Sequence, residues 1–168
     1  MTGIRQNDQV ERGKQTTVDR KSERELVVTR SFNAPAHIVF DAWTKPDLFR
    51  QWWTPQSFGI TFLYCDIDAR TGGGYKLVFS HPSAPEPMTF FGRYLDVIPG
   101  EKLVWTNEEG DEEGAITTVT FEDRGSSTIV VMHDLYPSKE ALDEAISSGS
   151  TSGFDESFDQ LEDVLTSS

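Results

Sequence analysis

A two-sided helix near the end of the chain limits the folds open to this sequence more than any other segment. Residues 150–165 are predicted to form it, because apolar side chains recur there at helical spacing: Phe154, Phe158, Leu161, Val164 and Leu165. The other side of this helix carries acids at positions 155, 156, 159, 162 and 163. The hydroxyls of residues 150–152 are candidate caps for its first turn. Such a helix needs an apolar surface to cover, so the rest of the fold must supply one.

The middle of the chain predicts that surface as a β-sheet. Short runs with strand-like composition are separated by turn residues: 25–32, 58–69, 75–80, 88–97, 102–107, 115–122 and 127–135. Within the fourth run, Gly92 is a candidate β-bulge. Because most connections between these runs are short, the sheet is expected to be antiparallel.

Two short helices are predicted directly after the first strand. Pro35 suits the first turn of a helix, and an apolar stripe runs from Ile38 to Trp43. Lys45-Pro46 breaks this helix, and residues 47–53 continue as the second one. The predicted fold class is therefore α+β, a curved antiparallel sheet wrapped around the long C-terminal helix, with the helix pair closing one end.

The chain is expected to hold a single domain, residues 24–168, behind a polar tail. Residues 1–23 lack apolar periodicity and their charges nearly cancel, so we expect this tail to be disordered. A partner-binding arm is the alternative for it. Residues 138–146 form a further short amphipathic helix, and the Ser- and Gly-rich residues 147–153 should separate it from the last one.

Charge and cysteine content exclude several classes of function. The formal net charge of −13 opposes binding to nucleic acid or to an anionic membrane surface. The single cysteine, Cys65, allows neither an intrachain disulfide nor a cysteine-based zinc site. No early apolar run resembles a signal peptide and none is long enough to cross a bilayer, so we expect a cytoplasmic protein without membrane insertion.

Motifs for catalysis or cofactors are weak. The Gly72-Gly73-Gly74 run is not followed by a helix or by a Gly-Lys-Ser/Thr end, so it is interpreted as a turn between strands rather than a phosphate cradle. The acidic residues 108–113 lack the alternating ligand spacing of a calcium loop and are interpreted as a hairpin tip. No histidine has a partner at metal-ligand spacing, and no nucleophile can be paired with a base. We therefore predict no catalytic residue, metal site or cofactor.

Aromatic residues on elements that should converge are the strongest candidates for a binding site. Each can belong either to the core or to the wall of a cavity, and a curved sheet facing one helix is difficult to fill completely. The candidate ligand-binding residues are Trp53, Tyr75, Leu77, Phe79, Trp105, His133, Phe154 and Phe158. His133 is included as a possible polar contact or base. Its orientation stays open, because Val130 and Met132 compete with Ile129, Val131 and His133 for the inward face of the last strand.

Taken in order, several segments resemble one known family. They are residues 28–47, Gln-Trp-Trp-Thr-Pro at 51–55, Cys-Asp-Ile-Asp-Ala-Arg-Thr-Gly-Gly-Gly-Tyr at 65–75, and residues 91–106, 117–122 and 152–161. This order and spacing resemble the activator-of-heat-shock-ATPase homologue family over about residues 26–165. The Trp52-Trp53 pair matches the family pattern, and Phe154 stands where the family often has tryptophan.

The resemblance implies a helix-grip fold of the START-like (SRPBCC) superfamily, which also holds the birch-pollen allergen and polyketide cyclases. Members bind lipids, hormones or polyketides, and only some are enzymes, so fold alone does not decide function. Our first hypothesis is a non-enzymatic binder of a small hydrophobic or amphipathic molecule. The alternatives are a co-chaperone-like module that binds a chaperone ATPase, and an enzyme of cyclase or hydrolase type that uses the same cavity.

Overall fold

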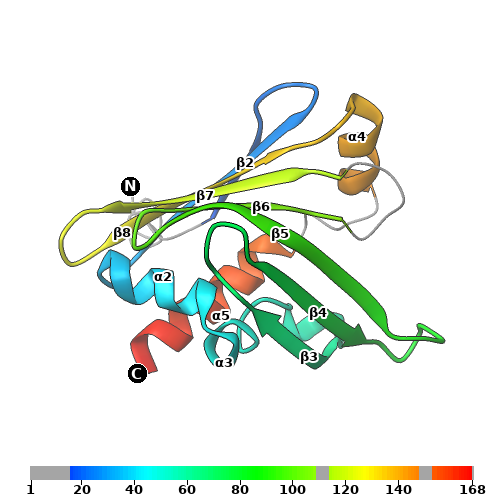
Figure 1. Cartoon of the computed structure of the whole chain (residues 1–168), viewed down its shortest axis with the longest axis horizontal. Coiled ribbons are helices and arrows are strands. Elements are labelled where there is room, and N and C mark those ends of the chain that lie inside the picture. The colour runs from blue at the N-terminus through cyan, green and yellow to red at the C-terminus, as the bar shows by residue number, and fades with distance from the viewer. Residues whose placement is uncertain (1–15, 109–113, 148–152, 168) are drawn as a thin grey trace, which may run out of the picture.

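The computed structural model describes residues 16–108, 114–147 and 153–167 of the chain. Its strands are β1 (Thr17–Arg20), β2 (Glu25–Phe32), β3 (Thr61–Ile67), β4 (Gly74–Ser80), β5 (Met88–Ile98), β6 (Lys102–Thr106), β7 (Ile116–Asp123) and β8 (Thr128–Leu135). Its helices are α2 (Ala36–Thr44), α3 (Pro46–Phe49), α4 (Lys139–Ser147) and α5 (Phe154–Ser167), with a 3-10 turn η2 at Gln56–Phe58. The strands form one antiparallel sheet in the order β1-β2-β8-β7-β6-β5-β4-β3 (Figure 1).

Alternation along the strands gives the sheet one buried face. In β8, Val130 and Met132 are buried while Ile129 and Val131 are half-buried, and in β2 Val28 and Phe32 are buried. The register Val28↔Met132 places the buried residues of both strands on the same side. Helices α2, α3 and α5 lie on that side of the sheet (Figure 1).

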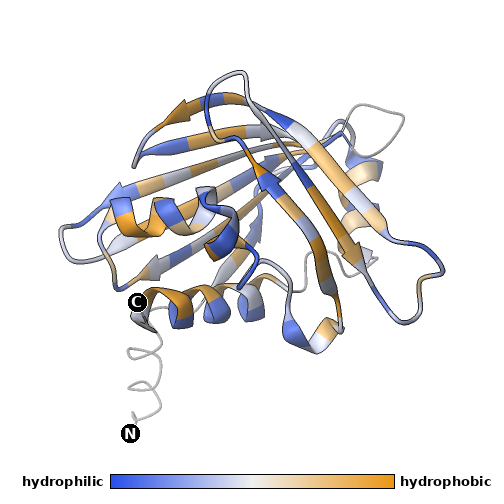
Figure 2. Cartoon of the chain, turned by 60° about the horizontal axis from the view of Figure 1, so that its bottom comes forward, coloured by the Kyte–Doolittle hydropathy of each residue, from blue (hydrophilic) through white to orange (hydrophobic). Residues whose placement is uncertain are grey.

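Helix α5 turns its apolar stripe toward the sheet and its hydrophilic stripe away from it (Figure 2). Phe158 and Leu161 are fully buried beneath the sheet. Arg30, buried on β2, reaches the carboxylate of Asp159 on α5, with 2.7 Å between Arg30 Nη1 and Asp159 Oδ1. Glu162, expected on the exposed acidic side of the helix, is buried instead.

Two strands of the sheet have irregularities in register, of the kind that bends a strand locally. The register of β3 shifts between Phe62 and Tyr64, and that of β5 shifts between Tyr94 and Asp96. Gly92 is not at the irregular position, so the bulge predicted there is wrong. A Cβ atom at Gly92 would lie 1.9 Å from the Thr106 carbonyl oxygen, so this glycine allows close approach of two backbones.

The predicted fold class is confirmed, and most elements begin or end within a few residues of their expected bounds. Helix α5 begins at Phe154. The caps proposed at 150–152 lie outside the described residues, as do residues 109–113 of the acidic loop. The prediction of a disordered tail does not hold for Thr17–Arg20, which pairs with β2 as strand β1. Residues 1–15 lie outside the described residues.

Candidate functional site

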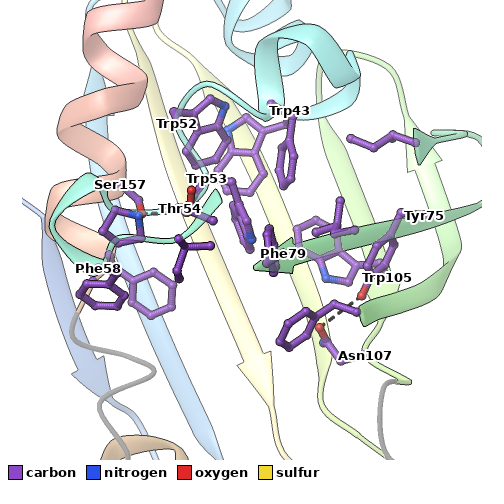
Figure 3. Close-up of a pocket in the computed structure, with 18 of the residues that line it drawn as sticks. Trp43, Trp52, Trp53, Thr54, Phe58, Tyr75, Phe79, Trp105, Asn107 and Ser157 are labelled. Atoms are coloured by element: carbon purple, nitrogen blue, oxygen red, sulfur yellow. Dashed lines mark hydrogen bonds between the residues drawn. The ribbon is translucent and has the colours of Figure 1, made fainter. Parts of the chain in front are cut away.

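A pocket of about 330 Å³ lies between α5, the loop before β3 and the inner face of β3, β4, β5 and β6 (Figure 3). Its helical and loop wall consists of Trp43, Phe49, Trp52, Trp53, Thr54, Pro55, Phe58, Ile60, Gly153, Phe154, Ser157 and Phe158. Its sheet wall consists of Ile67, Tyr75, Leu77, Phe79, Met88, Phe90, Tyr94, Trp105 and Asn107. Most of this surface is apolar, which is typical of sites that hold small molecules.

The predicted second helix, residues 47–53, is shorter in the structure, and its two neighbouring tryptophans lie in the turn after α3. They have different roles. Trp52 is fully buried, and its indole Nε1 donates a hydrogen bond to the Ala42 carbonyl at 3.0 Å. Trp53 is only half-buried and stacks on Phe49 with 4.8 Å between ring centroids. Trp52 therefore anchors the helix pair, while Trp53 gives the pocket an aromatic surface.

The sheet wall follows from the period of two along a strand. Tyr75, Leu77 and Phe79 alternate along β4 and all border the pocket, and Trp105 on β6 lies beside Tyr75 with 6.4 Å between ring centroids. Tyr94 completes this wall. Burial raises the pKa of the Tyr94 phenol well above its usual range, so the group stays protonated near neutral pH.

The first turns of α5 are held against the loop that follows α3. Ser157 Oγ donates to the Trp53 carbonyl at 2.9 Å, and Gln160 Nε2 donates to the carbonyls of Trp52 and Thr54. A Cβ atom at Gly153 would lie 2.8 Å from Pro55 Cγ, so the glycine lets the start of the helix meet this loop directly. These contacts fix Phe154 and Phe158 relative to Trp53.

Hydrogen-bonding groups gather at one end of the pocket, where Tyr75 and Asn107 lie together (Figure 3). The Tyr75 hydroxyl donates to the Thr106 carbonyl at 2.8 Å and lies 3.4 Å from Asn107 Oδ1. Asn107 Nδ2 donates to the Ala115 carbonyl at 2.9 Å and to Thr117 Oγ1 at 3.1 Å. An apolar pocket with a few convergent polar groups can orient a ligand as well as hold it.

His133 does not belong to the pocket, so its inclusion among the ligand-binding candidates is wrong. The register of β8 turns Val130, Met132 and Asp134 inward, and His133 therefore lies on the opposite face. There its Nε2 lies 2.8 Å from Glu25 Oε2. This hydrogen bond is the main cause that lowers the pKa of the Glu25 carboxyl.

The structure brings the other seven candidates together around the pocket: Trp53, Tyr75, Leu77, Phe79, Trp105, Phe154 and Phe158. Sequence reasoning did not find Asn107, Tyr94, Phe90 or Ile60. The strand pattern of residues 88–97 contained a signal for Phe90 and Tyr94, which share one face at a period of two. Nothing local marks Asn107, because its position depends on how β6 and β7 pair.

Two further features bear on the chemistry of the molecule. Among the described residues, no three or more His, Cys, Asp and Glu side chains are grouped as metal ligands. No helix within the same ranges is both long and apolar enough to span a membrane.

Comparison with known families and structures adds to this geometry. Residues 33–166 match the model of the family described as "Activator of Hsp90 ATPase homolog 1-like protein". The chain belongs to this family. The match spans the helix pair, the strands from β3 to β8 and α5, so it includes every wall of the pocket. The comparison with curated proteins gave no match.

Solved structures show the same fold. A crystal structure of a Rhodobacter sphaeroides protein is 21% identical, with a TM-score of 0.81 over 90% of this chain and 98% of that one. A Staphylococcus epidermidis protein with a solution structure is 28% identical, with a TM-score of 0.75 over 90% of this chain and 94% of that one. An AHSA1-like protein from Aeromonas hydrophila is 15% identical, with a TM-score of 0.65 over 84% and 92%. The helix-grip architecture is thus common to this chain and to these proteins.

Proposed function

We propose that this member of the family binds a small hydrophobic or amphipathic molecule between the curved sheet and α5. The observation that carries the proposal is the pocket of about 330 Å³, whose walls come from the helix pair, the strands β3 to β6 and α5. Its size is within the range of small-molecule sites. Affinity would come from apolar burial, roughly 25 cal/mol per Å² removed from water before the costs of association.

The lining favours binding without catalysis. The described residues around the pocket include no aspartate, glutamate, histidine, lysine, arginine or cysteine. Their polar side chains, such as Thr54, Asn107 and Ser157, are neutral hydrogen-bonding groups near pH 7. The hypothesis of a cyclase or hydrolase used His133 as its base, and that residue lies on the other face of the sheet.

Native mass spectrometry of the purified protein, before and after organic extraction, tests this proposal. We expect a co-purifying apolar molecule that extraction removes and that the same protein regains when the extract is returned. Ile67→Trp places a bulky ring at the pocket and should abolish uptake. Leu63→Trp, an equal change at an exposed position of the same strand, is its matched control. A protein that stays free of ligand and takes up no apolar probe would contradict the proposal.

A second candidate is interaction with a chaperone ATPase through the outer surface. The family description names activation of Hsp90 ATPase. Large apolar side chains are exposed on β3 and β5, namely Leu63, Tyr64, Phe91 and Leu95. A complex with such a chaperone that persists in Ile67→Trp and is lost in Phe91→Ser would favour this candidate over the pocket.

A further inference from the structure

A chain of polar side chains leads from the pocket into the interior of the sheet. Asn107 borders the pocket just after β6, Thr117 lies on β7, and Asp134 lies opposite Thr117 on β8. Asn107 Nδ2 donates to Thr117 Oγ1 at 3.1 Å, and Thr117 Oγ1 donates to Asp134 Oδ1 at 2.6 Å. Both Thr117 and Asp134 are buried, so the chain ends at a carboxylate shielded from solvent.

The partners of Asn107 determine which way its amide points. The Ala115 carbonyl can only accept, and it receives Asn107 Nδ2 at 2.9 Å. The Thr117 hydroxyl donates its hydrogen bond to Asp134, so toward Asn107 it acts as an acceptor, and Asn107 Nδ2 is the donor. Both amide protons are therefore directed into the sheet, which leaves Oδ1 at the pocket end of the side chain.

Oδ1 of Asn107 retains the capacity to accept a hydrogen bond. Within the described ranges its recorded contact is with the Tyr75 hydroxyl, at 3.4 Å. That hydroxyl has one proton and lies closer, at 2.8 Å, to the Thr106 carbonyl. An amide oxygen has two acceptor sites, so a ligand group can approach it from the pocket.

The buried carboxylate strengthens this acceptor. Donors that point one after another toward a negative charge polarise each other, and the low dielectric of the interior increases the effect. Desolvation raises the pKa of Asp134 to about 6, so the carboxyl is mostly ionised above that pH. The negative charge of Asp134 also repels an anionic ligand group placed beside the Asn107 amide.

We propose that the pocket selects apolar molecules that carry a hydroxyl or N–H donor at the Asn107 end, and disfavours those that carry a carboxylate there. This inference rests on the proposed function, because it assigns the chemistry of a ligand in the same pocket. It follows from the direction of the Asn107 amide and from the buried carboxylate behind it.

Three probes of one shape test the inference: 4-hydroxybiphenyl, 4-fluorobiphenyl and biphenyl-4-carboxylate, each titrated at pH 7.5 by isothermal calorimetry. One hydrogen bond should give the hydroxyl probe about tenfold higher affinity than the fluoro probe, although fluorine is the more apolar substituent. The carboxylate probe should bind most weakly. Equal affinity of the hydroxyl and fluoro probes, or tightest binding of the carboxylate, would overturn the inference.

Substitutions along the polar chain test whether Asn107 causes the preference for the hydroxyl probe. Asn107→Leu should remove the preference for the hydroxyl probe and leave binding of the fluoro probe. Thr117→Val should reduce the preference, because it disconnects Asn107 from Asp134. Thr118→Val, the next residue of β7 and directed to the other face, should keep it. Unchanged preference in a folded Asn107→Leu protein contradicts the inference, and the three probes on the unmodified protein decide it even if a variant fails to fold.

The probes also separate this inference from the proposed function. If 4-fluorobiphenyl binds and the hydroxyl probe binds no more tightly, the pocket is an apolar site. Only the inference that the ligand carries a hydrogen-bond donor is then wrong. If none of the three probes binds, the proposed function fails and the inference fails with it.

Discussion

The inner face of the sheet has a filled region and a hollow region. Under β2, β8 and β7, side chains such as Val28, Phe32 and Val119 are fully buried by α2 and α5. Under β4 and β5, aromatic side chains such as Tyr75 and Phe90 are only partly buried and line the pocket. Both regions are rich in large apolar residues, so composition alone does not separate them.

Coverage by helices makes the difference. Phe158, farther along α5, touches Phe32, Trp43 and Trp52, with ring centroids 5.7 to 6.1 Å apart. Phe154, one turn earlier, has a recorded ring contact with Phe158 alone among the described residues, at 6.3 Å. Both rings border the pocket, but only Phe158 is also part of the fully buried core, one turn along the same helix.

The largest effect is expected from Phe158→Ala, which tests the filled region. Removing a fully buried phenylalanine should lower the free energy of unfolding by about 4 kcal/mol, because the ring contacts are lost and a cavity remains. Urea denaturation followed by circular dichroism measures this. A loss below about 1 kcal/mol would show that this part of α5 is not a packed core.

The next effect concerns Asp134, a buried acid in the filled region. Its pKa is raised from 3.8 to about 6, chiefly by desolvation. The folded state therefore holds a proton that the unfolded state releases, and stability falls as pH rises from about 4 to about 6. Asp134→Asn should remove this loss and raise the free energy of unfolding above pH 7 by up to about 3 kcal/mol. Denaturation midpoints at pH 5 and pH 7.5 provide the measurement, and a gain of equal size at both values would contradict the assignment.

Phe154→Ala tests the hollow region. Because this ring is only partly buried, its loss should cost about 1 to 2 kcal/mol of stability. Binding of 4-fluorobiphenyl should weaken about fivefold, since one wall of the pocket is removed. Phe91→Ala, the same change on the exposed face of β5, should leave that affinity unchanged. Equal affinity of the Phe154→Ala and Phe91→Ala proteins for 4-fluorobiphenyl would mean that Phe154 does not contact the ligand.

The smallest effect is expected from His133→Ala. His133 lies on the face of β8 turned away from the pocket, where it pairs with Glu25. Its removal should not change the affinity for any of the three biphenyl probes in calorimetric titration. A clear loss of affinity would mean that the register of β8 is shifted by one residue, so that His133 faces the pocket.

Local patterns in the sequence predicted the elements and their order well. The first strand was expected at residues 25–32 and lies at Glu25–Phe32, because alternation and the Asn-Ala-Pro stop define its ends. The convergence of Trp105 and Phe154 was also predictable, since each lies on the apolar side of its element. Strand β1 was missed, because four exposed residues, of which only Val18 is apolar, gain strand structure only by pairing with β2.

The sequence by itself determined the α+β class, the apolar faces and the aromatic character of the interior, since these depend on side-chain spacing along single elements. Only the tertiary structure decided the inward face of β8, which places His133 outside and Asp134 inside. It also decided that Asn107 borders the pocket and connects through Thr117 to that acid. The physical reason is that strand register and helix coverage are set by contacts between segments distant in the chain, and these leave no local signature.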